Sequence, residues 1–163
     1  MFDDDHLAEL AGAAGYGEAP ALVLRTRTLN HEELRQRVAR LAGWLSREVP
    51  TRGARVATWA AKGELTCLMP LAAARAGLVH VPINPLLKRA QVAHILADSG
   101  AVLLMGTPSR LATLEEGDLP GGCTALDEAE ALAAAEAAGL ELGPSQADPN
   151  ELAAILYTSG STG

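Results

Sequence analysis

The chain has 163 residues, of which 48% are hydrophobic and 20% charged, and its formal net charge is -7. This composition is typical of one globular domain rather than a disordered segment. The acidic excess argues against nucleic acid and anionic lipid as partners, since both bind dense lysine and arginine. No apolar stretch reaches the ~20 residues that span a bilayer, so no membrane span is expected.

The cysteines and the first residues favour a cytoplasmic location. Cys67 and Cys123 are far apart and lack the spacing of a CxxC pair or a metal site, so reduced thiols are expected. Cys67 falls on an apolar segment and is expected to be an inert core thiol. The first residues, MFDDDHL, are acidic where a secretory signal would be basic.

The first predicted elements after a leader at residues 1–19 are a hairpin and a long helix. Residues 21–24 form an apolar strand, and a polar return follows through residue 28. Asn30 and Glu33 are spaced as a capping pair for a helix over about residues 31–47. Apolar residues then recur at three- and four-residue spacing, so one helix face is expected to pack inward. They are Leu34, Val38, Leu41 and Leu45.

Strands and helices then alternate. RVATWA at 55–60 is a strand, and a nearly all-apolar helix over 63–76 ends at Gly77, a residue suited to a left-handed cap. LVHVPINP at 78–85 is a short strand closed by two prolines. A helix over about 89–98 ends before Gly100, and AVLLM at 101–105 is a buried strand.

The last third contains a loop-rich region, an alanine-rich helix and one more strand. Residues 106–122 are loop-rich, LDEAEALAAAEAAG at 126–139 is a helix, 143–150 is a connector, and ELAAILYT at 151–158 is a strand. Strands and helices at this spacing predict parallel pairing with right-handed crossovers. The fold class is therefore α/β, with a parallel sheet flanked by helices, and ligands are expected beyond the carboxyl ends of the strands.

The run TSGSTG follows the last predicted strand. Its residues are Thr158, Ser159, Gly160, Ser161, Thr162 and Gly163. Polyphosphate binds where hydrogen-bond donors are many and side chains are small, and hydroxyls with glycine amides meet that need. The run matches neither GxxxxGK[ST] nor GxGxxG. From residue types alone, a phosphate loop and a flexible Ser/Gly connector both remain open.

LYTSGSTG resembles the phosphate-loop signature of the AMP-forming adenylating superfamily, which comprises acyl-CoA synthetases, luciferases and the adenylation domains of peptide synthetases. In that family Pro-Lys-Gly continues the run. LAAARAGLVHVPINPLLKRAQVAHILADSGAVLLM and LVLRTRTLNHEELRQRVARLAGWL are similar to two further family segments, in the same order. The resemblance implies that residues 1–163 are a single partial domain, the amino-terminal portion of the family's large domain.

The resemblance implies a ligase. The intact enzyme would use ATP and Mg²⁺ to convert a small-molecule carboxylic acid to an acyl adenylate, and would pass the acyl group to a thiol, usually that of coenzyme A. The loop at residues 158–163 would hold the β- and γ-phosphates. No catalytic or metal-binding residue is expected here, because in the family these lie downstream. The 163-residue fragment is therefore expected to be inactive, to bind ATP weakly, and to self-associate through an open strand edge.

Two alternative functions stay open: an adenylation domain that loads a carrier protein, and a non-catalytic α/β binding or scaffold module with an incidental Ser/Gly tail. Other polar residues have simpler interpretations. His80 is expected to be a hydrogen-bonded structural residue. Lys88 and Arg89 are expected to be solvated, as are the acidic residues between 127 and 136.

Overall fold

The computed structural model of the chain describes residues 17–145, 148 and 150–158. An antiparallel hairpin of β1 (Pro20–Val23) and β2 (Thr28–Asn30) precedes a parallel sheet of four strands. The sheet has the order β4-β3-β5-β6. Its strands are β3 (Arg55–Trp59), β4 (Val79–Pro82), β5 (Ala101–Gly106) and β6 (Thr124–Asp127). The predicted α/β class with a parallel sheet is confirmed.

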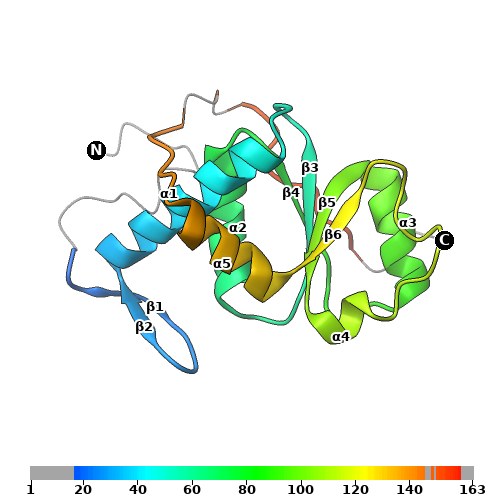
Figure 1. Cartoon of the computed structure of the whole chain (residues 1–163), viewed down its shortest axis with the longest axis horizontal. Helices are drawn as coiled ribbons and strands as arrows, with labels where there is room; N and C mark the ends of the chain where they lie inside the picture. The colour runs from blue at the N-terminus through cyan, green and yellow to red at the C-terminus, as the bar shows by residue number, and fades with distance from the viewer. Residues whose placement is uncertain (1–16, 146–147, 149, 159–163) are drawn as a thin grey trace.

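Helices cover both faces of this sheet. They are α1 (His31–Glu48), α2 (Glu64–Arg75), α3 (Arg89–Ser99), the short α4 (Pro108–Leu111) and α5 (Glu128–Ala138). In Figure 1, α1, α2 and α5 lie on one side of the sheet and α3 on the other. In the part of the chain that the structure describes, no helix is both long and apolar enough to cross a bilayer.

Local signals set the helix ends. The Asn30 side chain accepts a hydrogen bond from the Glu33 amide at 2.8 Å, and the Glu33 carboxylate accepts one from the Asn30 amide at 2.8 Å. This is the predicted capping box. Gly77 and Gly100, with φ of 70° and 65°, follow α2 and α3 in the left-handed region. Both helices therefore end within a residue or two of the predicted positions.

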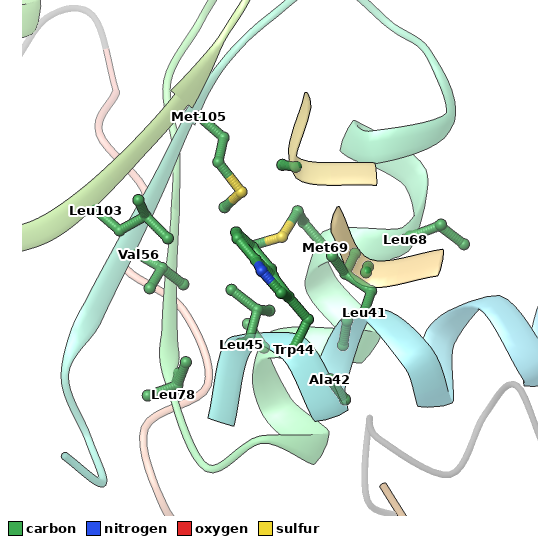
Figure 2. Packing of buried hydrophobic residues seen from close by; sticks show 14 of the residues in the cluster. Leu41, Ala42, Trp44, Leu45, Val56, Leu68, Met69, Leu78, Leu103 and Met105 are labelled. Carbon is green, nitrogen blue, oxygen red and sulfur yellow. The ribbon is translucent and has the colours of Figure 1, made fainter. Parts of the chain in front are cut away.

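Two apolar cores lie on opposite faces of the sheet. The first packs α1, α2 and α5 on β3 and β5. Figure 2 shows Trp44 of α1 at the centre of this core, with the side chains of Met69 and Met105 beside its indole. The second core packs α3 on the other face and includes Trp59 and Leu104. Each core thus holds one buried tryptophan among aliphatic side chains.

Two elements differ from the prediction. β6 follows the predicted loop-rich region at 106–122 and overlaps the first two residues of the helix predicted over 126–139, and it pairs with β5 through the register Leu104↔Ala125. Its residues TALD include two exposed positions, so no apolar run marks it. Residues 151–158, in contrast, were predicted to be a strand. Their only described pairing is a single parallel bridge between Ala154 and His80.

Three side-chain environments also differ from the prediction. Cys67 is exposed, although the all-apolar pattern of α2 suggested a core thiol. Glu136 of α5 is not simply solvated, since it accepts a 2.7 Å hydrogen bond from Arg40 of α1. Arg89 pairs with Asp118 at 3.4 Å and with Glu115. Each partner is remote in sequence or lies across a loop, so helix periodicity alone does not reveal it.

Candidate functional site

The carboxyl ends of β3 and β4 and the segment 153–158 meet at one edge of the sheet, where parallel sheets bind ligands. A cavity of about 480 Å³, here called the edge pocket, opens there. Its lining residues are Thr58, Ala60, Lys62, Thr66, Pro70, His80, Pro82, Ile83, Asn84, Pro85, Ala154, Leu156 and Tyr157. The predicted location beyond the strand ends therefore coincides with a real hollow.

A buried polar pair lies against the edge pocket. His80 Nε2 lies 2.9 Å from Thr58 Oγ1, and both residues are 3% exposed. Burial lowers the pKa of His80 from 6.5 to about 4, so the imidazole is neutral at physiological pH. It contributes a fixed dipole and no positive charge. The expectation of a hydrogen-bonded structural histidine agrees with this geometry.

Among the described residues, Lys62 is the one cation that lines the edge pocket. Its side chain is exposed and forms no ion pair within the described residues. It precedes α2, whose first turn is held by Thr66: the Gly63 amide donates to the Thr66 hydroxyl at 2.9 Å. An ammonium group without an ion-pair partner, next to the amino terminus of a capped helix, is suited to bind an anion. The sequence analysis did not single out Lys62.

The segment before the hydroxyl run is attached to both β4 and α3. The Ile155 amide donates to the His80 carbonyl at 2.9 Å. Two residues later, the Tyr157 hydroxyl donates to Asp98 Oδ2 at 2.6 Å. Thr158 follows and is exposed. Of the six predicted loop residues, Thr158 alone is described; Ser159, Gly160, Ser161, Thr162 and Gly163 lie outside the described residues.

A second cavity of about 390 Å³, here called the basic pocket, lies beside the first and shares Pro85 with it. Its lining residues are Trp59, Pro85, Leu87, Lys88, Arg89, Ser109, Arg110 and Thr113. Arg110 Nε donates to the Pro85 carbonyl at 3.1 Å, which fixes its guanidinium at the rim. Among the described residues, neither Lys88 nor Arg110 forms an ion pair. The pocket combines residues 85–89 with 109–113, so no single motif could have revealed it.

The described residues do not contain a donor set that fits a divalent metal. No group of three or more histidine, cysteine, aspartate or glutamate residues lies close enough together in the described ranges. Magnesium prefers carboxylate oxygens and retained waters. The part of the chain described here therefore offers no built magnesium site.

Known proteins match this chain over nearly its whole length. The family model described as AMP-binding enzyme matches residues 11–163. The L-proline–[L-prolyl-carrier protein] ligase of Pseudomonas fluorescens is 32% identical over 167 residues, which cover 97% of this chain and 32% of that protein. The fatty acid–[acyl-carrier-protein] ligase ScoC of Streptomyces coeruleorubidus is 34% identical over 146 residues, covering 88% of this chain and 28% of that protein.

Solved structures match the fold equally well. ATP-bound MatB from Rhodopseudomonas palustris gives a TM-score of 0.82 at 26% identity, over 97% of this chain and 33% of that one. VinN in complex with 3-methylaspartate gives 0.80 at 26% identity, over 96% and 44%. This chain spans about a third of the length of the curated relatives named above. With the family model covering residues 11–163, the chain belongs to the AMP-binding enzyme family.

Proposed function

We propose that this chain is the amino-terminal, phosphate-binding part of an ATP-dependent ligase that activates a carboxylic acid as an acyl adenylate and passes the acyl group to a thiol. One observation carries the proposal. In a member of this family, the segment that leads into the hydroxyl run ends, at Thr158, beside the edge pocket, where Lys62 is the one cation among the described lining residues. Ligand binding at this edge is the rule for parallel sheets.

The chemistry assigns binding roles to these residues and no proton transfer. A carboxylate oxygen attacks the α-phosphorus, the bond to the bridging oxygen breaks, and pyrophosphate leaves. The hydroxyls and amides of residues 158–163 donate hydrogen bonds to the β- and γ-phosphate oxygens, where negative charge collects on the leaving group. Lys62 offsets part of that charge from the edge pocket. The neutral His80 holds Thr58 and the strand ends in register.

Magnesium bound to ATP would neutralise phosphate charge and orient the leaving group. The described residues hold no donor set for this ion. The acid-binding pocket and any catalytic lysine are likewise assigned to parts of the enzyme outside this chain. We therefore expect residues 1–163 alone to be inactive and to bind ATP weakly, because a chain of net charge -7 repels a triphosphate.

The test is ATP–pyrophosphate exchange by the whole gene product with a panel of fatty, aryl and amino acids. A triple variant with alanine at Ser159, Ser161 and Thr162 should lose about 100-fold or more in exchange rate, since preorganised donors of this kind typically contribute that much. Ser46→Ala is the control, because this hydroxyl donates to the Gly43 carbonyl within α1, away from the site.

Two outcomes would contradict the proposal. Exchange that is absent with every acid would favour the non-catalytic α/β binding or scaffold module. Full exchange in the triple alanine variant would show that these hydroxyls do not hold the phosphates. A single acid that supports exchange would identify the substrate class, which nothing in residues 1–163 specifies.

For the acceptor thiol we propose coenzyme A, with a carrier protein as the alternative. The basic pocket supports coenzyme A, because Lys88 and Arg110 present two charges with no acidic partner among the described residues to a ligand rich in phosphate. The carrier-protein alternative is supported by the names of the two relatives, both carrier-protein ligases. A carrier protein presents its thiol on an arm with a single phosphate, so it needs fewer cations.

The variant Lys88→Gln distinguishes coenzyme A from a carrier protein as the acceptor. Its side chain is exposed, so the fold should tolerate the change. With coenzyme A as acceptor, we expect the KM for coenzyme A to rise by about fivefold, the size of one exposed charge-assisted contact, with the KM for ATP unchanged. Lys88→Arg should restore the lower value. Thioester formation with a carrier protein and none with coenzyme A would establish the alternative.

A further inference from the structure

Residues 151–157 lie beside β4, but few backbone hydrogen bonds join the two segments. His80 donates to the Ala153 carbonyl and accepts from the Ile155 amide, each at 2.9 Å, and these bonds form an isolated bridge. Beyond Ile155, no further backbone bond to Tyr157 or Thr158 is formed within the described residues. The position of Thr158 therefore depends on side chains rather than on a strand ladder.

Tyr157, the residue before Thr158, is anchored by its side chain. Its hydroxyl donates to Asp98 Oδ2 at 2.6 Å across 59 residues of sequence, and its ring packs with Ile155 against the second core. Burial, followed by the Asp98 carboxylate, raises the pKa of Tyr157 to about 12. The phenol therefore keeps its proton, and so its role as donor, throughout the physiological range.

The negative charge of Asp98 is unfavourable for the stability of α3 at this position. It lies in the last turn of α3, which has no basic residue in that turn and ends at Gly100. The carboxyl end of a helix is the negative end of its dipole, so a carboxylate there is unfavourable. Asp98 also forms no ion pair among the described residues. Its one described side-chain partner is Tyr157.

We propose that Asp98 is a positioning residue, which acts through the Tyr157 hydroxyl to hold Thr158, the first residue of the proposed phosphate loop. The inference rests on the proposed function and adds to it a residue 60 positions before Thr158. The bond ties the phosphate-binding end of the segment to α3, whereas the bidentate pair between Arg52 Nη2 and Glu151, at 2.9 and 2.7 Å, ties its far end.

The test compares Asp98→Ala, Tyr157→Phe and the double variant in the whole gene product. Each single variant should raise the KM for ATP by about tenfold, as expected for a lost hydrogen bond to a charged acceptor. The KM for the carboxylic acid should stay within about twofold. The double variant should be no worse than either single variant, since both remove the same bond. Arg52→Gln is the matched control, which breaks the far pair and should leave the KM for ATP unchanged.

A structural readout makes this inference testable apart from the proposed function. Amide hydrogen exchange over residues 155–158 should accelerate by about tenfold in both single variants and remain unchanged in Arg52→Gln. Unchanged exchange and an unchanged KM for ATP would overturn the role of Asp98. The wild-type product could activate no acid while the two single variants still show accelerated amide exchange. That result would contradict the proposed function but would support the role of the Tyr157–Asp98 hydrogen bond in holding Thr158.

Discussion

His80 shows how one buried residue couples the sheet edge to pH. Its ring nitrogen bonds to Thr58, and its main chain forms both hydrogen bonds of the bridge to residues 153–155. Its side chain is 3% exposed, so protonation would place a charge in the protein interior without a described acidic partner. A residue that joins β3, β4 and the segment 153–155 at the edge pocket therefore also makes the stability of the fold depend on pH.

The sign of that dependence follows from the depressed pKa. Between about pH 6.5 and pH 4, the unfolded chain binds a proton at His80 that the folded chain does not, so stability falls as the pH falls through this window. The loss should approach about 3 kcal/mol below pH 4. Urea midpoints at pH 7.5 and pH 5 should differ clearly in the wild type and much less in His80→Gln.

His94 on α3 supplies the control for this prediction. It is exposed, so His94→Gln should retain the wild-type dependence of stability on pH. An NMR titration of the His80 ring would give the same information directly, with an expected midpoint near 4. A midpoint near 6.5 would mean that water reaches the imidazole and that the edge pocket extends to the His80 ring.

At the scale of elements, α1 depends on a close backbone approach at Gly43. A Cβ at this position would overlap the carbonyl oxygen of Leu140, in the chain that leaves α5. The amide of Leu142 also donates to the Ala39 carbonyl of α1 at 3.0 Å. The chain after α5 therefore lies directly on the α1 backbone, and it can do so because this position has no side chain.

Gly43→Ala should consequently destabilise the fold by about 1–3 kcal/mol, as overpacking typically does, even though alanine is the better helix former by about 1 kcal/mol. Gly121→Ala is the control, since no atom lies within 4 Å of a Cβ there and the residue is not in a helix. Thermal unfolding of the two variants measures the difference. Equal midpoints would show that the chain after α5 moves away from α1 at little cost.

Sequence patterns predict elements well where the signal is local. The capping box at Asn30 and Glu33 and the glycines after α2 and α3 act within a few residues, and they fall where expected. β6 was missed because its pairing with β5 depends on a partner some twenty residues away. Residues 151–158 were predicted as a full strand because their apolar pattern could not show how few backbone bonds they make.

At the scale of the molecule, the spacing of helices and strands predicted the parallel sheet but not its order. The order β4-β3-β5-β6 depends on which face of the sheet each connecting helix crosses. The same spacing of helices and strands is compatible with other strand orders. Both pockets join segments more than twenty residues apart, so Lys62 and Arg110 were not identified as candidates. The family resemblance predicted a phosphate loop at residues 158–163, whereas the neighbouring charges of Lys62 and Arg110 could be identified only from the fold.

Self-association through the strand edge stays a prediction. Leu152 and Leu156 lie in the segment beside β4 and are 58% and 71% exposed, which is high for two large aliphatic side chains four residues apart. An extended, apolar edge of this kind pairs readily with another chain. The two leucines are therefore the side chains we expect at any contact between copies.

The two tryptophans divide between the layers, one on each face of the sheet. Trp44 lies in the core under α1, and Trp59 lies in the core under α3 and also borders the basic pocket. Because the chain has no other tryptophan, replacing either one leaves a single indole whose emission reports on one side of the molecule. Emission spectra can thus follow the melting of each half separately, and the Trp59 signal alone should respond when a phosphorylated ligand enters beside it.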